Sequence, residues 1–243
     1  MAGAETAAAD ASIPMKIAVA IFAKTIGLSP VKSRLASTVG VELAEAFYSR
    51  SIACTHDMML SVVATSKVEV FPHWALAEED GPVQFDGRGY PALWTGEGDL
   101  GARLATISER LFDDYDGVVM IGSDSPQLCS GHLVSAIAQM RHDPDLCVVG
   151  PAEDGGFYFF GTGRPVLRKV WESVTYSKDT TFNELVSRLE GRDIHYLPKE
   201  QDVDAAEDLK RLENNLSGKV GRLSESQREL LQWLRSNQGC SAC

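Results

Sequence analysis

Short apolar segments rich in Ile and Val constrain this chain most. Residues 15–22 (MKIAVAIF) and 117–121 (GVVMI) are too short for core helices and have the composition of strands buried on both faces. Amphipathic helices are predicted between such segments, at residues 41–63 and 99–112. Strands that alternate with helices predict βαβ units, a mostly parallel α/β sheet, and ligand sites at the carboxyl ends of the strands.

The rest of the chain continues this alternation. We expect further strands at residues 67–71, 83–85, 146–149, 157–160 and 194–197 and further helices at residues 131–140, 179–189, 205–216 and 225–236. Ser224 and Gln227 have the spacing of a capping box at the start of the last helix. The sequence therefore predicts one domain over residues 15–216, preceded by a leader at residues 1–14 and followed by a C-terminal helix and tail at residues 217–243.

Charge and hydropathy exclude several protein classes. The net charge of −11 disfavours a general affinity for nucleic acid or anionic lipid, and no apolar run reaches the ~20 residues of a membrane helix. Residues 1–14 are rich in Ala, contain Glu5 and Asp10, and lack the basic segment of a signal peptide, which favours a mobile leader. Five scattered cysteines predict no disulfide framework, so we expect a cytoplasmic protein.

A basic loop directly follows the first predicted strand. Residues 23–35 hold Lys24, Lys32 and Arg34 and no acidic residue, against the acidic background of the chain. Lys supplies a point charge, Arg can bond two oxygens at once, and Gly27 permits close backbone approach, which together favour phosphate binding. The Gly-Lys-Ser/Thr ending of a Walker A loop is missing, and a solvated basic loop is the alternative interpretation.

Carboxylates follow two later strands. Asp124 lies in the segment GSDSP directly after residues 117–121, and Asp202 and Asp204 follow the last predicted strand. Mg²⁺ and Mn²⁺ prefer a few carboxylates completed by phosphate oxygens and water, so Asp124 and Asp202 are candidate metal ligands. The alternatives are helix caps, with Asp124 capping residues 131–140 and Asp204 capping residues 205–216.

Two further segments are candidates for the same site. Asp154, Gly155 and Gly156 join two predicted strands, where they would bring a carboxylate and bare backbone against a ligand, form a tight Asp-Gly hairpin turn, or do both. Arg103 lies in the first turn of the helix at residues 99–112, where it would reach a phosphate or lie at the surface.

The patterns of histidines and cysteines are weaker evidence for a functional site than the segments above. The five histidines lack zinc-ligand spacing. Cys54, Cys129 and Cys147 fall on or near predicted helices and strands, which predicts core packing. Cys240 and Cys243 form a Cys-x-x-Cys that would bind soft metal or cycle redox, or lie in a mobile tail.

Taken in chain order, these segments resemble a bacterial family of GT-A-fold proteins usually labelled glycosyltransferase, which is related to the guanylyltransferases of deazaflavin and molybdenum cofactor synthesis. The resemblance covers about residues 16–212. It departs at Tyr176-Ser177, where the family often has Trp-Ser or Trp-Gly, and the tail after Leu216 is not part of the pattern. The matching segments are Phe22-Ala23-Lys24, PVKSRL at residues 30–35, DLGAR at residues 99–103, GSDSP at residues 122–126, GPAEDGGFY at residues 150–158, and DVD at residues 202–204 with EDL at residues 207–209.

The resemblance implies a three-layer, Rossmann-like GT-A fold that holds a nucleotide above the first strands. Its phosphates would lie near Lys24, Lys32 and Arg34, with Arg103, Gly155 and Gly156 as further contacts. Mg²⁺ or Mn²⁺ would bind at Asp124, and Asp154 and Asp202 would hold a second metal or serve the acceptor. The partners implied are a nucleotide or nucleotide-sugar and a small-molecule acceptor; the oligomeric state is left open.

Several functions fit these residues. Glycosyl transfer from a nucleotide-sugar, with Lys32 and Asp154 as catalytic residues, is our prediction. Nucleotidyl transfer from an NTP is the runner-up, because Ser123-Asp124-Ser125 holds one acid where glycosyltransferases of this fold usually have Asp-x-Asp. A non-catalytic nucleotide binder and a thiol-metal carrier built on the terminal cysteines are the remaining alternatives.

Overall fold

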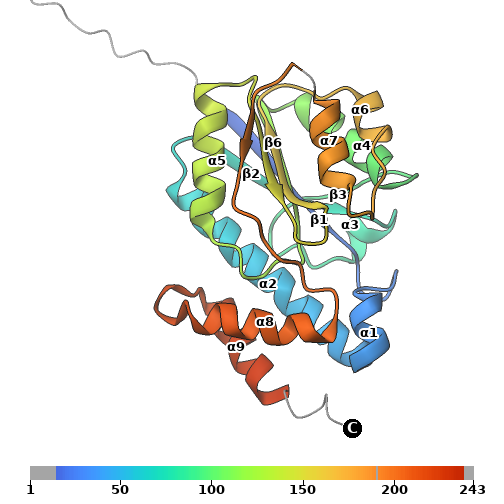
Figure 1. Ribbon diagram of the computed structural model, residues 1–243, viewed down its shortest axis with the longest axis vertical. Coiled ribbons are helices and arrows are strands. Elements are labelled where there is room, and N and C mark those ends of the chain that lie inside the picture. The colour runs from blue at the N-terminus through green and yellow to red at the C-terminus, as the bar shows by residue number, and fades with distance from the viewer. Residues whose placement is uncertain (1–14, 190, 238–243) are drawn as a thin grey trace, which may run out of the picture.

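The computed structural model describes residues 15–189 and 191–237, which form a sheet covered by helices on both faces (Figure 1). Within these residues the sheet has seven strands in the order β3-β2-β1-β4-β6-β5-β7. Their bounds are β1 (Lys16–Ala23), β2 (Glu69–Leu76), β3 (Ala92–Trp94), β4 (Gly117–Gly122), β5 (Cys147–Pro151), β6 (Phe157–Thr162) and β7 (Ile194–Tyr196).

The sheet is mostly parallel, as predicted. β1 runs parallel to both β2 and β4, β2 to β3, and β5 to β7, while β6 alone is antiparallel to its neighbours β4 and β5. The antiparallel step arises because β5 and β6 are joined by a short hairpin at residues 152–156. Since β1 and β4 pair from Ile17↔Gly117 to Phe22↔Gly122, their loops leave the sheet at the same edge.

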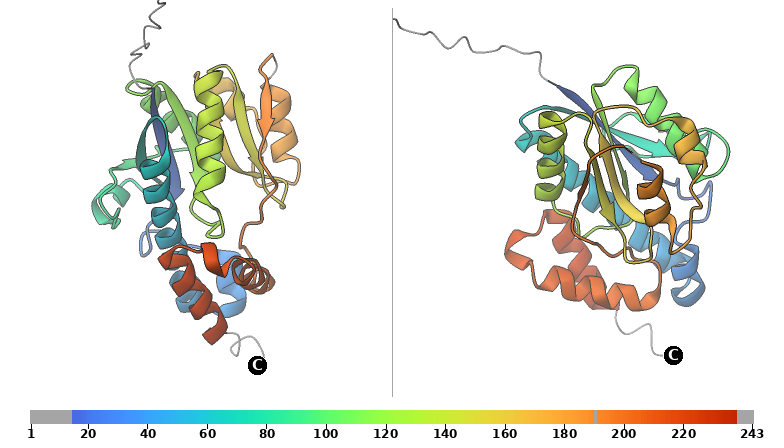
Figure 2. Two further views of the ribbon diagram at one scale, coloured as in Figure 1. Left: turned by 90° about the vertical axis from the view of Figure 1, so that its left-hand side faces the viewer. Right: turned by 45° about the horizontal axis from the view of Figure 1, so that its top comes forward.

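Helices complete the three layers of the predicted α/β class. α2 and α5 cover one face of the sheet, and α4, α6 and α7 cover the other (Figure 2). The helices are α1 (Ser33–Val39), α2 (Val41–Thr65), α3 (Gly81–Gln84), α4 (Leu100–Phe112), α5 (Ser130–His142), α6 (Arg168–Glu172), α7 (Thr181–Arg188), α8 (Ala206–Ser217), the 3-10 turn η1 (Val220–Arg222) and α9 (Glu225–Asn237).

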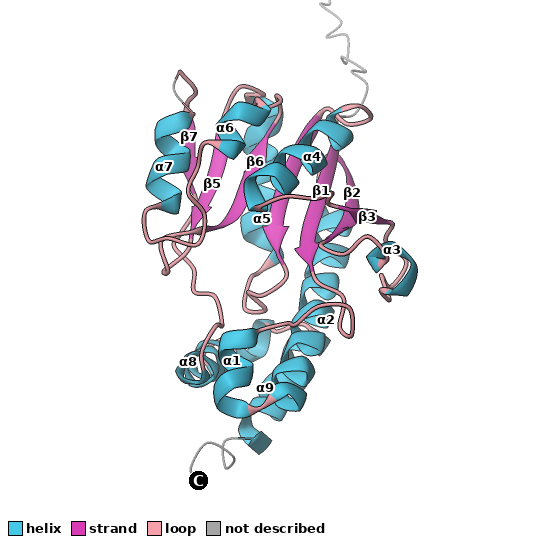
Figure 3. Cartoon of the chain, turned by 90° about the vertical axis from the view of Figure 1, so that its right-hand side faces the viewer, coloured by secondary structure: helices cyan, strands magenta, loops and turns pink. Residues whose placement is uncertain are grey.

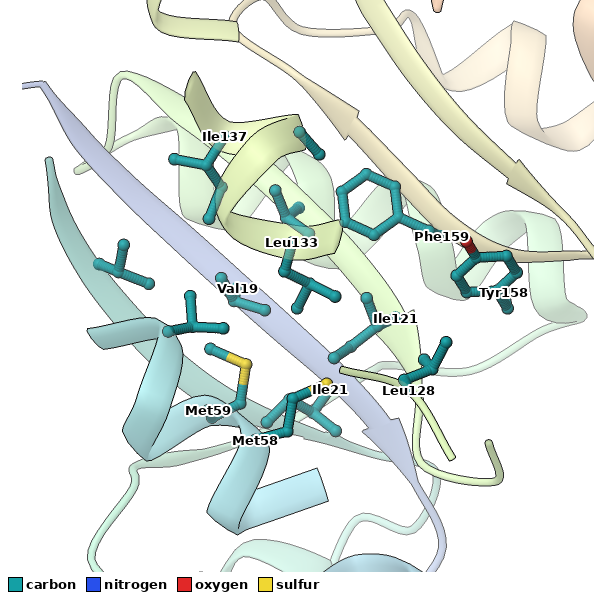
Figure 4. Packing of buried hydrophobic residues seen from close by; sticks show 14 of the residues in the cluster. Val19, Ile21, Met58, Met59, Ile121, Leu128, Leu133, Ile137, Tyr158 and Phe159 are labelled. Atoms are coloured by element: carbon teal, nitrogen blue, oxygen red, sulfur yellow. The ribbon is translucent and has the colours of Figure 1, made fainter. Parts of the chain in front are cut away.

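The central strands pack between these layers because they are apolar on both sides. On the face of α2 and α5, Met59 and Leu133 pack against Val19, Ile21 and Ile121 (Figure 4). On the opposite face, alternate residues of the same strands contact α4, α6 and α7. Burial on both faces explains why these strands read as continuous apolar runs in the sequence.

A third cluster lies beyond the carboxyl ends of β1 and β4. Helices α1 and α9 pack there against α2, and α8 packs against α9 and α1 (Figure 3). The Trp233 ring of α9 lies 6.5 Å from that of Phe47 and 4.9 Å from the guanidinium of Arg50, both on α2. These contacts bring α9 close to the edge where the candidate residues lie. A domain boundary at residue 216 stays a prediction.

Some local predictions were confirmed. The capping box of α9 forms, with Ser224 N–H donating to Gln227 Oε1 at 3.1 Å and Gln227 N–H donating to Ser224 Oγ at 3.2 Å. The described part of the chain has no helix with the length and hydropathy of a membrane span. The predicted leader at residues 1–14 and the pair Cys240 and Cys243 lie outside the described residues.

Other local predictions were wrong. Residues 83–85 do not form a strand: Pro82 falls in the first turn of α3, where its fixed φ suits a helix, and Val83 is 88% exposed. The strand of this region is β3, which pairs with β2. Cys129 is exposed rather than in the core because it occupies the N-cap position of α5, whereas Cys54 and Cys147 are buried as predicted.

Candidate active site at the carboxyl edge of the sheet

Lys32 links two chain segments that are far apart in sequence. Its Nζ lies 3.0 Å from Asp124 Oδ2, after β4, and 3.2 Å from Asp204 Oδ1, before α8. The side chain is only 6% exposed, and its backbone adopts φ 45°, a left-handed conformation that turns the chain into α1. The basic loop and the carboxylates predicted from the sequence therefore meet at one edge.

The charges of this cluster fix one another. Burial opposes the charge of Lys32, but Asp124, Asp204 and Asp202 outweigh it and raise the pKa of the ammonium group. Burial alone would raise the pKa of Asp124, but Lys32 outweighs it through charge and a hydrogen bond, so that this pKa is lowered. Asp124 and Lys32 are both charged at neutral pH as a result.

Asp202 lies beside this pair without a cation of its own. Its Oδ1 accepts a hydrogen bond from Ser125 Oγ at 2.6 Å. Burial, followed by the negative charge of Asp124, raises the pKa of Asp202 to about 7. The positive charge of Lys32 lowers the pKa of Asp202 by less than burial and Asp124 raise it.

Neither carboxylate that the sequence offered as a helix cap serves as one. The N-cap of α5 is Cys129, so Asp124 is free to face Lys32. At α8, Asp208 Oδ2 accepts hydrogen bonds from the backbone N–H groups of Asp204 and Ala205. The Asp204 carboxylate instead pairs with Lys32 and with Arg34, whose guanidinium lies 3.0 Å away and is 77% exposed.

Residues 15–189 and 191–237 contain no group of three or more His, Cys, Asp or Glu side chains arranged to hold a metal ion. The strongest pair of carboxylates for a hard cation is Asp124 with Asp202. Mg²⁺ in proteins is commonly held by one or two carboxylates and completed by substrate phosphates and water. A site of that kind needs no third side-chain ligand.

Comparisons with known proteins identify structures with the same fold. Residues 61–178 match the protein family described as "Uncharacterized protein conserved in bacteria (DUF2064)". No curated protein matches the chain in sequence. A solved structure from Desulfovibrio desulfuricans G20, provisionally assigned as a nucleotide-diphospho-sugar transferase, superposes with a TM-score of 0.76 at 24% identity, over 93% of this chain and 96% of its own. The chain has the fold of the nucleotide-diphospho-sugar transferases.

Two cytidylyltransferase structures share this fold less closely. One from Leptospira borgpetersenii has a TM-score of 0.52 at 16% identity and covers 93% of this chain and 96% of its own. The 4-diphosphocytidyl-2C-methyl-D-erythritol synthase of Anaerococcus prevotii has a TM-score of 0.51 at 11% identity and covers 80% and 94%. The resemblance predicted from the sequence motifs is confirmed at the level of the fold.

Within this transferase fold, two predicted phosphate contacts are bonded to neutral groups. The exposed Lys24 donates from Nζ to the carbonyl of Pro30 at 3.2 Å. Arg103 donates to Gly98 O at 3.0 Å, Ala77 O at 2.5 Å and Thr95 Oγ1 at 3.0 Å. Arg103 thereby ties together the segments that follow β2 and β3, and among the residues that the structure describes no hydrogen bond or ion pair joins it to Lys32, Asp124 or Asp204.

The Asp-Gly-Gly segment forms the turn between β5 and β6. Asp154 Oδ1 accepts from Gly156 N–H at 2.8 Å, and its negative charge contributes, after burial and Asp124, to the raised pKa of Asp202. Gly155 has φ +89°, and a Cβ there would lie 2.3 Å from the backbone of Asp179. The absence of a side chain at Gly155 thus serves packing against the segment before α7.

Sequence analysis missed two residues that hold the loops of this transferase fold. The Tyr48 hydroxyl accepts from Lys24 N–H at 2.7 Å and lies 3.4 Å from Ser123 Oγ, so it joins the loops after β1 and β4. Glu78 accepts from Thr25 N–H at 2.9 Å and from the hydroxyl of Ser29. Glu78 follows directly after β2, a position at a strand's carboxyl end that could have marked it.

Open space adjoins the loop that these residues hold. A groove of about 180 Å³ runs between the loop after β1, helix α2 and the segment after α3. Its lining residues are Thr25, Ile26, Tyr48, Ser49, Ile52, Gln84, Phe85, Asp86 and Arg88. The basic loop is therefore accessible from the side of α2 as well as from the edge of the sheet.

Proposed function

We propose that the protein is a divalent-metal-dependent transferase that uses a nucleotide-activated donor. The observation that carries this proposal is the convergence of Lys32, Asp124 and Asp202 where β1 and β4 end. Ligands of open α/β sheets bind outside the carboxyl ends of the strands, and this edge combines cations for phosphates with carboxylates for a metal. The fold shared with nucleotide-diphospho-sugar transferases supports the same conclusion.

The donor set fits Mg²⁺ or Mn²⁺. Both candidate ligands supply hard oxygen atoms, and the pKa of Asp202 is raised because burial and the charge of Asp124 outweigh the lowering effects of the Ser125 hydrogen bond and of Lys32. Asp124 and Asp202 would hold the ion, which when bound would neutralise charge on the donor phosphates. Lys32 holds Asp124 in place from the opposite side.

The remaining predicted residues take roles around this centre. Lys24 and Arg34 line the exposed side of the loop and would bind phosphate oxygens, with the backbone of Gly155 and Gly156 as further donors. Arg103 would join them only by exchanging its present bonds to Gly98, Ala77 and Thr95. Asp154, exposed at the hairpin, would accept the proton of the acceptor hydroxyl.

Among transfer reactions, we favour glycosyl transfer from an NDP-sugar. Lys32 and Arg34 are already paired with carboxylates, which leaves Lys24 as the one cation of the described loop without a carboxylate partner. The uncompensated positive charge is therefore small, and an NDP-sugar is less negatively charged than an NTP. The positive charge of a single metal ion and of this loop matches the negative charge of a diphosphate better than that of a triphosphate.

The test is to incubate the protein with Mn²⁺ and a panel of UDP- and GDP-sugars and to measure release of free NDP. Asp124→Asn should reduce the rate by at least ~100-fold, because it removes a metal ligand together with the partner of Lys32. Asp113→Asn, at an exposed residue after α4, is the matched control and should leave the rate unchanged. Nucleotide binding that Asp124→Asn does not alter, without turnover, would indicate a non-catalytic binder.

Nucleotidyl transfer is the second candidate. The two cytidylyltransferase structures of the same fold and the single acid in residues 123–125 favour it. The same protein and variants, supplied with each NTP and Mg²⁺, distinguish the reactions. Pyrophosphate release from an NTP without NDP release from any sugar donor would replace glycosyl transfer with nucleotidyl transfer.

A further inference from the structure

The C-terminal segment contacts the loop that carries Asp124. Residues 123–129 connect β4 to α5, and α9, which packs on α2 and α8, is hydrogen-bonded to this connection. The matched family segment ends at residue 178, so α9 lies outside it. Its contacts with the loop involve polar side chains.

Gln227 makes the closest of these contacts. Its amide Nε2 donates to the carbonyl oxygens of Pro126 at 2.8 Å and Leu128 at 3.3 Å. The side chain is 8% exposed, and its Oε1 is occupied by the N–H of Ser224. One buried amide therefore caps α9 and bonds the loop, and all of its polar atoms are used.

The carbonyl between these two is also bonded from the C-terminal segment. Lys219 Nζ lies 3.5 Å from the carbonyl oxygen of Gln127. The Gln127 side chain in turn donates to Gln201 O at 2.6 Å, next to Asp202. Three consecutive carbonyls of the loop thus face donors from residues 219–227, and the loop is tied to the segment between β7 and α8 that carries the second carboxylate.

We propose that Gln227 is a positioning residue for the metal site, so that α9 sets the geometry of Asp124. Pro126, whose carbonyl Gln227 holds, is two residues from Asp124, and Ser125 between them bonds Asp202. Without the Gln227 amide, the loop would lose the two hydrogen bonds to its carbonyl groups. The distance between the Asp124 and Asp202 carboxylates would then no longer be fixed. The inference rests on the proposed function, because it assigns a role in metal binding.

The experiment compares Gln227→Met and Gln227→Glu with the wild-type protein. Neither replacement can donate to the carbonyls of Pro126 and Leu128, but Gln227→Glu keeps an acceptor for Ser224 N–H. Partners behind metal ligands typically contribute about 10-fold to metal affinity. We therefore expect both variants to bind Mn²⁺ about 10-fold more weakly in calorimetry, with unchanged affinity for a metal-free nucleoside diphosphate. Gln232→Met, at an exposed residue of the same helix, should match the wild type.

Hydrogen exchange of the metal-free proteins tests whether Gln227 holds the loop, and this test does not depend on the proposed function. The backbone amides of residues 123–125 and 127–129 should exchange faster in both Gln227 variants than in the wild type and Gln232→Met. Unchanged exchange there would overturn the positioning role. If the wild-type protein binds no Mn²⁺, the metal site fails, while the exchange data still decide whether Gln227 holds the loop. Should Gln227→Met not fold, Lys219→Met tests the same loop through Gln127.

Discussion

Two cationic side chains at the same edge of the sheet differ in the charge of the groups that they bind. Lys32 is bonded to the carboxylates of Asp124 and Asp204, whereas Arg103 is bonded to two backbone carbonyls and a hydroxyl. A cation between carboxylates sets the charge and pKa of acidic groups, while a cation between carbonyls fixes the path of the chain. The residues around Lys32 are therefore suited to chemistry, and those around Arg103 to support.

Replacing Lys32 tests the first half of this comparison and should have the largest effect. Lys32→Met leaves Asp124 and Asp204 close together without their shared cation. Breaking a buried ion pair is costly, and partial exposure of both carboxylates moderates the loss of unfolding free energy to about 3 kcal/mol. Transferase activity should fall by at least ~100-fold, because the position of Asp124 is no longer fixed. Urea denaturation and initial rates measure the two effects.

Lys67→Met is the control for this substitution. Lys67 is exposed and follows the C-terminal end of α2, whereas the segment with Lys32 precedes the N-terminal end of this helix. It should change neither stability nor rate. A fully active Lys32→Met protein would show that the ion pair is structural only, and the distinction between the two cations would disappear.

Replacing Arg103 tests the second half. Arg103→Met removes the donor to Gly98 O, Ala77 O and Thr95 Oγ1, and the unpaired carbonyls should lower the free energy of unfolding by about 2 kcal/mol. Since no carboxylate of the candidate site depends on Arg103, Mn²⁺ affinity should change by less than about 2-fold. Chemical denaturation and calorimetry provide both values.

Arg110→Met on the same helix serves as the matched control, because Arg110 is exposed and should be neutral for both measurements. A large loss of Mn²⁺ affinity in Arg103→Met, with little loss of stability, would assign Arg103 to the binding machinery and remove the contrast with Lys32.

The sequence predicted the elements of this comparison better than their partners. The strands at β1 and β4 were visible because burial on both faces makes them apolar throughout, and Asp124 and Lys32 were identified because each follows such a strand. The pairing of Lys32 with Asp204 could not be predicted, since it depends on the path of residues 198–204 back across the edge. The local pattern instead predicted that Asp204 caps α8. In the structure the Asp208 carboxylate accepts the hydrogen bonds at the start of this helix.

The same limitation applies to the supporting residues. Tyr48 lies on the buried side of α2, and nothing in its local sequence indicates that its hydroxyl bonds two loops. Gln227 was identified as part of a capping box, but its second role depends on the packing of α9 near residues 123–129. Tertiary contacts of this kind have no periodicity that a single sequence can display.

Replacing Arg34 should have the smallest effect on stability and tests the role of Lys32 most specifically. It pairs with the same Asp204 as Lys32, but its guanidinium side chain is 77% exposed, so solvent screens the interaction. Arg34→Met should change the free energy of unfolding by less than about 0.5 kcal/mol. If Arg34 binds donor phosphate as proposed, the KM for the donor should rise by about 5-fold with little change in kcat, since uniform binding is lost.

The comparison between Arg34 and Lys32 then separates burial from charge, because both cations share one carboxylate. Steady-state kinetics over a range of donor concentrations measures the split between KM and kcat, and Arg222→Met, at an exposed residue of η1, is the control. If Arg34→Met lowers kcat as strongly as Lys32→Met does, both cations act on the reacting groups. Burial beside Asp124 would then no longer distinguish the catalytic cation from the binding one.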